Sequence, residues 1–345
     1  MGLFIGNLFS MFQLHSFGRS KRARDEADER RIAHATSILN RADPKGVKIH
    51  KSWAPNSRGM LLFQQCLLPM PIDDEEKDTL SSSRKPTLTA SVASSKKANS
   101  SSSSNNNSSS SNSSSNSSSN YSNLKGARGA IGICHGFGDH TSDLLMDVAV
   151  RFCREGFAVL MMDVEGHGLS DGVHGYITDL RVTATDYSDY FEKQLASFEH
   201  LRGLPFFLYG VSMGGALCFN QVTLPDCSIK KTVKGVILSA PMIKINPDFK
   251  PPEIVINALI KISDIIPYAP ITPTADLIDK CFKKPEQVAR ARASKLSYHG
   301  QPRLKSGLAC LDAMDDIENR MQDLSHPCLI LHGDADQVTS WKVGT

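Results

Sequence analysis

The sequence predicts an α/β fold with a mostly parallel sheet, and three observations lead to that fold class. From residue 130 onward, short apolar runs alternate with longer segments of helix-forming residues, which is typical of a parallel sheet with helices on both faces. One apolar run leads through a Gly-x-Ser-x-Gly pattern, Gly210 to Gly214, directly into an apolar helical segment. A long excursion, 243–324, separates the last two apolar runs, and we expect it to form a helical cap over the carboxyl ends of the strands.

The expected elements begin with two strands, Val47–Trp53 and Met60–Leu68, joined by a turn rich in Pro, Asn and Gly. Further strands are expected at Ala130–Cys134, Phe157–Met162, Phe206–Tyr209, Val233–Leu238 and Cys328–Leu331. Helices are expected at Ser142–Glu155, Thr183–Leu201, Gly215–Val222, Ile254–Ile266, Pro285–Ser294 and Arg303–Leu324.

Residues 1–44 form a tail before the first strand. Met1 to Phe17 is apolar and would be amphipathic as a helix, and basic residues follow it directly at 19, 21, 22 and 24. An apolar face beside a basic cluster is typical of an anchor on anionic lipid, so residues 1–24 are a candidate membrane anchor. A tail or leader of another kind is the alternative. A charged helix is expected over residues 25–40, with Glu29, Arg30 and Arg31 on its solvent face.

Residues 70–125 are polar, and 99–120 consist only of Ser and Asn. Such a stretch has no apolar area to offset its chain entropy, so we expect a disordered insertion in a surface loop. A functional linker is the alternative. The remaining blocks, 45–69, 126–242 and 325–345, would together form the α/β core.

The composition is that of an ordinary globular protein, with 40% apolar and 22% charged residues. A net charge of +3 without a basic stripe argues against a nucleic-acid binder. Eight cysteines are scattered singly, which favours buried free thiols over disulfides or a metal site, and therefore a cytoplasmic protein, peripheral to the membrane if the anchor operates. No apolar run reaches the ~20 residues that a membrane span needs.

The pattern around Ser212, placed between a strand and a helix, has the form of a nucleophile elbow. Its glycines let the chain reverse sharply where a Cβ would clash. A serine nucleophile needs a base and oxyanion donors. The loop from His135 to Gly138 follows a strand and can aim a backbone N–H at a reacting carbonyl, and the Met213 amide can supply a second donor. His135 itself is expected to hold this loop rather than to act as the base.

A serine triad on this fold follows the order Ser, acid, His along the chain. Asp334 and Asp336 both follow the strand Cys328–Leu331, and the one that is not the acid is expected to accept loop N–H groups. No histidine follows Asp336. His140 and His174 lie in loops that can reach the rim of the site, and His167 is expected to be structural.

Several longer motifs resemble the monoacylglycerol lipase-like branch of the α/β-hydrolases, which includes caffeoylshikimate esterases and carries a serine aminopeptidase-type hydrolase domain. The resemblance covers about 45–68 and 129–341. Its carriers include His135-Gly136-Phe137-Gly138-Asp139, Gly166-His167-Gly168-Leu169-Ser170-Asp171-Gly172, Gly210-Val211-Ser212-Met213-Gly214-Gly215 and His332-Gly333-Asp334-Ala335-Asp336.

The resemblance implies an α/β-hydrolase fold with Ser212 as nucleophile, Asp336 as acid, and the Phe137 and Met213 amides as the oxyanion hole. It implies no metal and no organic cofactor. The family's histidine lies beyond the position of Thr345, so we expect the last strand and helices of the fold to be truncated from residues 1–345.

The function expected from these features is that of a serine esterase on monoacylglycerols, lysophospholipids or similar acyl esters. The partner is a small acyl-ester substrate, with a membrane surface at residues 1–24. A non-catalytic binding protein on the hydrolase fold is the alternative, because the histidine is absent from this chain. An acyltransferase or a peptidase on the same scaffold is a third reading.

Overall fold

The computed structural model describes residues 26, 28–30, 33–35, 37–70, 126–244, 251–272, 278–336 and 338–340. The chain divides into two compact units, one of Met1–Pro69 with Gly126–Thr345 and one of Met70–Lys125. The described residues other than Met70 belong to the first unit. The predictions for the anchor at residues 1–24 and for the Ser/Asn stretch at 99–120 lie outside the described residues.

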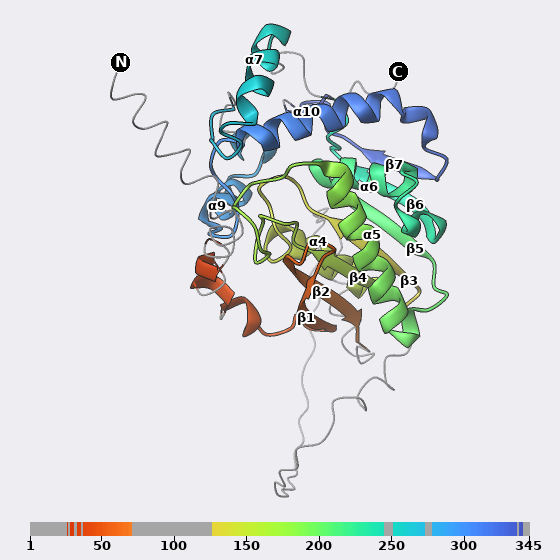
Figure 1. The fold of residues 1–345 in the computed structure, drawn as a ribbon. Coiled ribbons are helices and arrows are strands. Elements are labelled where there is room, and N and C mark those ends of the chain that lie inside the picture. The colour runs from red at the N-terminus through yellow and green to blue at the C-terminus, as the bar shows by residue number, and fades with distance from the viewer. Residues whose placement is uncertain are drawn as a thin grey trace, which may run out of the picture. The chain divides into compact units, whose positions relative to one another are not determined.

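The described strands form one sheet in the order β1-β2-β4-β3-β5-β6-β7 (Figure 1). Their bounds are Val47–Pro55, Leu61–Pro69, Gly129–Cys134, Phe157–Met162, Phe206–Val211, Val233–Ser239 and Cys328–Leu331 for β1 to β7. The β1–β2 and β2–β4 pairs are antiparallel, and all pairs from β4 to β7 are parallel. The predicted mostly parallel sheet is confirmed, with strand ends within two residues of those expected.

After the N-terminal segment, the described helices are α4 to α10, together with short 3-10 segments. Their bounds are Leu144–Arg154, Leu180–Ser197, Met213–Thr223, Glu253–Ser263, Ile278–Cys281, Pro285–Ala293 and Leu304–Asn319 for α4 to α10, with 3-10 turns at Glu199–Leu201, Ser228–Lys231 and Met321–Asp323.

Helices cover both faces of the sheet. The side chains of Ile131 and Ile133 in β3 pack with those of Leu145 and Ala149 in α4. Because side chains alternate along a strand, Gly132 faces the other way, where its Cα lies against the ring of Phe191 in α5. Figure 1 shows α5 and α6 together on that second face. A two-faced α/β sheet follows, as the alternation in the sequence predicts.

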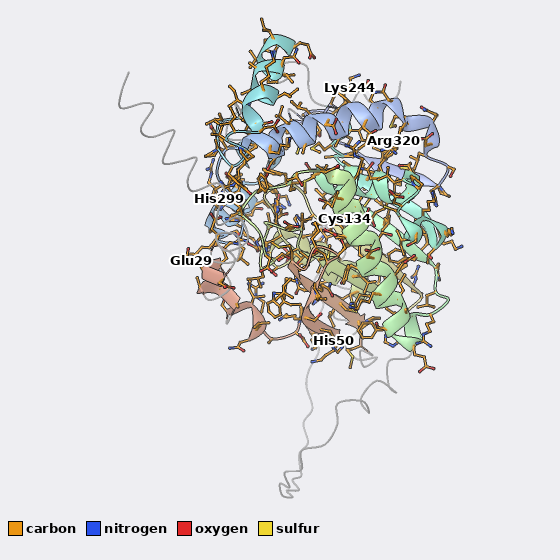
Figure 2. The ribbon with its side chains drawn as sticks, in the orientation of Figure 1. Glu29, His50, Cys134, Lys244, His299 and Arg320 are labelled. Atoms are coloured by element: carbon orange, nitrogen blue, oxygen red, sulfur yellow. The ribbon has the colours of Figure 1, made fainter. Side chains whose placement is uncertain are left out.

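The segment between β6 and β7, called the cap below, lies on the loops that follow β3 and β4. The Tyr298 amide donates to the Gly138 carbonyl oxygen at 2.7 Å, and the Ile177 amide donates to Ser306 Oγ at 2.9 Å. At its far end α10 crosses α6, where Arg320 (labelled in Figure 2) donates to Asn220 Oδ1 at 2.7 Å. A cap over the carboxyl ends of the strands is therefore observed, while its limits at 243 and 324 stay a prediction.

The N-terminal segment, meaning the described residues from 26 to 44, is helical wherever it is described between 26 and 39. Glu29 is exposed, as expected, and is labelled in Figure 2. The expectation for Arg30 is wrong, because only 9% of this residue is exposed. Its guanidinium donates to three backbone carbonyls of the loop after β4, which the local charge pattern does not reveal. The Arg31 side chain lies outside the described residues.

The strand β7 lies at one edge of the described sheet and is exposed along its whole length. Leu329, Ile330 and Leu331 are 53%, 46% and 49% exposed. All eight cysteines are free thiols, with five of them buried. Among the described helices, none combines the length and the apolar character needed to cross a membrane.

Candidate active site

Ser212 occupies the junction between β5 and α6, as predicted. Its backbone has φ 53° and ψ −119°, in the left-handed half of the map that residues other than glycine rarely adopt. Such a conformation costs on the order of 1–3 kcal/mol and persists only where the surroundings hold it. The Ser212 amide donates to the Ser239 carbonyl at 3.0 Å, and its own carbonyl accepts from the Gly215 and Met242 amides. The elbow is thus tied to the end of β6 on one side and to α6 on the other.

The two glycines of the elbow are required by close backbone approach. A Cβ on Gly210 would overlap the carbonyl of Gly214, and a Cβ on Gly214 would overlap the carbonyl of Cys134 at the end of β3. The predicted clash at both flanking positions is confirmed. These contacts bring the first turn of α6 against the strand ends, and the Met213 amide of that turn follows Ser212 directly.

The loop after β3 also lies beside Ser212. A Cβ built on Gly136 would stand 3.4 Å from Ser212 Cβ and 4.0 Å from its Oγ, so this glycine lies directly beside the serine side chain. Phe137, the expected oxyanion donor, follows Gly136 directly, and Met213 opens α6 on the other side of Ser212. The two expected donors therefore come from the two segments that flank the serine hydroxyl.

His135 holds this loop in place. The Val164 amide donates to His135 Nε2 at 2.9 Å, so that nitrogen is an acceptor and the ring proton sits on Nδ1. That N–H donates to the Gly136 carbonyl at 2.8 Å. Complete burial lowers the pKa of His135 and keeps the ring neutral. With both nitrogens engaged, His135 has no lone pair for Ser212 and serves the loop, as the sequence suggests.

Asp163, which the sequence reading did not single out, organises the next loop. It follows β4, is fully buried, and accepts hydrogen bonds from the Thr141 amide, the Thr141 hydroxyl and the Leu169 amide at 2.7–2.8 Å. These bonds join the loop after β3 to the loop after β4. An aspartate directly after an apolar strand and before a glycine-rich stretch is the signal that identifies it, because a buried carboxylate must find several donors.

His167 lies in the loop after β4 under Phe137. Its ring centroid is 5.5 Å from that of Phe137, edge to face, and 5.4 Å from that of His135. Burial, and then the neighbouring His135, hold the pKa of His167 well below its usual range. Its Nδ1 lies 3.2 Å from the Glu165 carbonyl oxygen. His167 therefore contacts its own loop, as expected of a structural residue.

The loop after β7 carries Asp336. Its Oδ1 accepts from the Val338 and Thr339 amides at 2.8 and 3.0 Å, and its Oδ2 accepts from the Thr339 hydroxyl at 2.9 Å. His332 Nε2 lies 3.2 Å from the same Oδ2. Asp334 is exposed, and it is Asp336 that accepts the loop N–H groups, so the expectation for the second aspartate is wrong.

Backbone hydrogen bonds connect the Asp336 loop to the elbow. The Ala240 amide, after β6, donates to the Leu331 carbonyl at 2.7 Å, and the Ser340 amide donates to the Lys244 carbonyl at 2.9 Å. The same loop after β6 reaches Ser212 through the Met242 amide. Asp336 therefore belongs to the same end of the sheet as Ser212, although no direct bond joins the two side chains in the described structure.

The two histidines near the rim are held by the cap. His140 is buried, its Nδ1 accepts from the Ser142 amide at 3.1 Å, and its Nε2 lies 2.9 Å from Ser294 Oγ. His174 Nε2 donates to the Leu296 carbonyl at 3.1 Å. Burial, and then the charge of Arg30, lower the pKa of His174 to about 4. Neither imidazole has an acceptor nitrogen directed at Ser212 in these contacts.

In the part of the chain that the structure describes, no three side chains of His, Cys, Asp or Glu gather as a metal site would require. The polar groups that the structure places at this end of the sheet include the Ser212 hydroxyl, the backbone amides that follow it and the Asp336 carboxylate.

Comparison with known proteins agrees with this arrangement. Residues 125–344 match the family model described as serine aminopeptidase, S33. Caffeoylshikimate esterase from Arabidopsis thaliana is 29% identical over 213 residues, which cover 61% of this chain and 63% of that protein. Monoglyceride lipase from Homo sapiens is 24% identical over 210 residues, covering 61% of this chain and 66% of that protein. The match thus spans less than two thirds of the length of these relatives.

Solved structures show the same fold. The crystal structure of a soluble variant of monoglyceride lipase from Saccharomyces cerevisiae, in complex with a substrate analog, aligns with a TM-score of 0.60 at 16% identity. The alignment covers 88% of this chain and 81% of that chain. Because the family model matches well over half of the sequence, this chain belongs to the serine aminopeptidase S33 family and has the α/β-hydrolase fold.

Proposed function

We propose that the chain is a serine esterase that acts on monoacylglycerols, lysophospholipids or similar acyl esters through an acyl-enzyme at Ser212. The observation that carries the proposal is the strained backbone of Ser212, at φ 53° between β5 and α6, with Gly136 beside its side chain. A serine held this way presents its Oγ away from the sheet, where an ester carbonyl can approach.

In the proposed reaction, Ser212 Oγ attacks the ester carbonyl carbon as its proton passes to a base. The carbonyl oxygen becomes an oxyanion that the Phe137 and Met213 amides stabilise. The C–O bond of the ester then breaks, the alcohol leaves with a proton, and the acyl group remains on Ser212. Water attacks the acyl-enzyme in the same manner and releases the fatty acid and the free serine. Asp336 is the proposed acid that orients the base.

The general base is the missing part of this proposal. None of the described histidines at the strand ends, 135, 140, 167, 174 and 332, forms a hydrogen bond with Ser212. Without a triad histidine, turnover falls by on the order of 10⁶ while the oxyanion hole retains ~10³–10⁴ over water. We therefore expect residues 1–345 alone to turn over esters slowly.

The proposed substrate class rests on the chemistry of the relatives and on one feature of the cap. The relatives named above are an esterase and lipases for monoglycerides. The helix α7 exposes Ile254, Ile260 and Ile262, with Ile254 exposed at 80%. Exposed aliphatic side chains on the cap support an amphiphilic acyl ester over a polar peptide. The proposed membrane contact through residues 1–24 fits the same substrates.

Labelling of the purified chain with a fluorophosphonate tests the nucleophile. We expect one labelled residue, Ser212, with labelling lost in Ser212→Ala and retained in the control Ser197→Ala. Turnover of a short-chain monoacylglycerol should be slow, and free imidazole in the buffer should raise it by supplying the base. Rapid Ser212-dependent turnover without imidazole would contradict the missing base and direct attention to His140 or His174.

Absence of labelling would favour the second candidate, a binding protein on the hydrolase fold. The observation in its favour is that no described histidine forms a hydrogen bond with Ser212. Equilibrium binding of a monoacylglycerol to an unlabelled, folded chain would then be the supporting result.

A further inference from the structure

Arg30 reaches from the N-terminal segment into the loop after β4. Its Nε donates at 3.1 Å to one carbonyl, and its Nη2 donates at 3.0 and 3.3 Å to two more, those of Gly168, Ser170 and Gly172. These carbonyls belong to a tight loop whose amides already form other hydrogen bonds. The Gly166 amide, for instance, donates to the Asp171 carbonyl of the same loop. A buried carbonyl without a donor is costly, so Arg30 stabilises this particular loop conformation.

Glu26 acts on the next part of the same loop. The His174 amide donates to Glu26 Oε2 at 3.2 Å, and the His174 carbonyl accepts from Arg303 Nε of the cap at 2.7 Å. The two charged side chains lie 3.9 Å apart. A second Arg303 nitrogen donates to the Tyr268 carbonyl at 2.8 Å. The backbone of His174 is thus held on both sides, by a carboxylate of the N-terminal segment and by a guanidinium of the cap.

Apolar contacts join the same three parts. Ile38 of the N-terminal segment, Phe63 of β2, Leu169 of the loop and Leu296 of the cap form one buried cluster, with Trp53 packed against it. Each of these four side chains is at most 8% exposed. The indole N–H of Trp53 donates to the Leu169 carbonyl at 3.3 Å. The polar and apolar contacts therefore converge on a single junction.

Tyr298 of the cap connects this junction to the loop after β3, which holds the expected oxyanion donor Phe137. Its amide donates to the Gly138 carbonyl at 2.7 Å, and its ring centroid lies 6.2 Å from that of Phe137, edge to face. The same ring lies 5.3 Å from that of His174 and 5.7 Å from the guanidinium carbon of Arg303. The Tyr298 ring therefore packs against His174 and Arg303, which are the two residues that Glu26 contacts.

We propose that Glu26 and Arg30 are positioning residues of the active site, which hold Tyr298 and the loop after β4 so that the Phe137 amide is directed at the oxyanion position. They act through their neighbours and do not touch the substrate. An oxyanion donor must be placed within a fraction of an ångström, and a 1 Å error can cost ~10²-fold in rate. The catalytic part of this inference rests on the proposed function of Ser212, whereas its effect on loop order does not.

Four variants of the full chain test the proposal: Arg30→Ala, Arg30→Lys, Glu26→Gln and the control Glu29→Gln. Glu29 lies on the same segment and is exposed. Its variant removes one carboxylate, as Glu26→Gln does, but leaves the contacts of Glu26 with His174 and Arg303 in place. Amide hydrogen exchange of peptides covering 135–141 and 164–176 is measured below the unfolding transition, together with the rate of Ser212 labelling by a small fluorophosphonate.

Arg30→Ala and Glu26→Gln should raise exchange in both peptides and lower the labelling rate about tenfold, because the donor is no longer held in place. Arg30→Lys should recover part of both effects, since a lysine can reach one of the three carbonyls. Glu29→Gln should match the parent chain. If Arg30→Ala does not fold, Glu26→Gln, which keeps the side-chain shape, decides the question.

Unchanged exchange at 135–141 in both variants, with only a lower melting temperature, would overturn the proposal and leave the segment a purely stabilising part. A parent chain that is not labelled at Ser212 would instead refute the proposed function, and the exchange measurement would still decide the positioning role.

Discussion

The loops that follow β3 and β4 and the loop that follows β7 lie at the same end of the sheet but are held in different ways. The first two are joined through fully buried groups, above all Asp163 and His135, and are covered by the cap. The loop after β7 is ordered mainly by its own Asp336, on a strand exposed along its length. The nucleophile and oxyanion side of the candidate site is therefore over-determined, while the acid side depends on local bonds.

This difference matters for catalysis because preorganised donors stabilise charge without a reorganisation cost at the moment of reaction. On the Ser212 side, the serine backbone is bonded to the end of β6, to the loop after β6 and to α6, and the loops after β3 and β4 are bonded to each other. On the acid side, the described bonds to the Asp336 carboxylate all come from its own loop, from His332, Val338 and Thr339.

The largest expected effect is a loss of stability when a buried group between the loops after β3 and β4 is removed. Asp163→Ala should lower the free energy of unfolding by roughly 3–5 kcal/mol, because it leaves buried amide donors at Thr141 and Leu169 unsatisfied. The control Asp334→Ala removes an exposed carboxylate and should stay within about 0.5 kcal/mol. Chemical denaturation with a common slope measures both. Equal losses in the two variants would erase the distinction drawn above.

Acid should weaken the covered side next. The pKa of His174 is lowered to about 4 from 6.5, first by burial and then by Arg30, so the folded chain keeps this ring neutral. The unfolded chain takes up the proton below pH 6.5, so this contribution to stability is complete above pH 6.5 and is lost as the pH falls toward 4. The loss can reach about 3 kcal/mol. His135 and His167 act in the same direction.

Unfolding free energies measured at several pH values between 4 and 8 check this, with His174→Gln as the comparison variant. The variant should show a flatter dependence than the parent chain. A parallel dependence in the two proteins would show that His174 is not the group responsible.

The exposed side gives a smaller effect. Asp336→Asn should cost about 1–2 kcal/mol, since an amide oxygen still accepts from one loop amide but the charge-assisted bonds at Thr339 and His332 are lost. The control is Thr339→Val, which removes one of these bonds and leaves the Asp336 carboxylate in place. If Asp336→Asn were as damaging as Asp163→Ala, the acid loop would be as firmly held as the buried ones.

The smallest effect is expected for the segment that lies between β2 and β3 in the sequence. Deletion of residues 99–120 should change the unfolding free energy by less than ~1 kcal/mol, because the cost of closing a loop varies slowly with its length. Thermal unfolding of the deleted and the full chain measures this. A large fall in melting temperature would show that the Ser/Asn stretch packs.

The strand pattern and the elbow could be predicted from the sequence because both are local. Apolar runs of strand length, separated by helical segments, specify the parallel sheet, and a Gly-x-Ser-x-Gly between strand and helix specifies the sharp reversal at Ser212. The two glycines follow from the same geometry, since a helix that starts directly above a strand leaves no room for a Cβ at Gly210 or Gly214.

Only the tertiary structure decided which charged groups are buried and what they hold. Arg30 has the sequence environment of a solvent-exposed residue, yet its partners lie 138 to 142 residues away along the chain. Asp163 and Asp336 likewise acquire their different surroundings from the covering of β4 and the exposure of β7. The physical reason is that burial and the matching of donors to acceptors depend on long-range packing, whereas strand and turn preferences depend on neighbours in sequence.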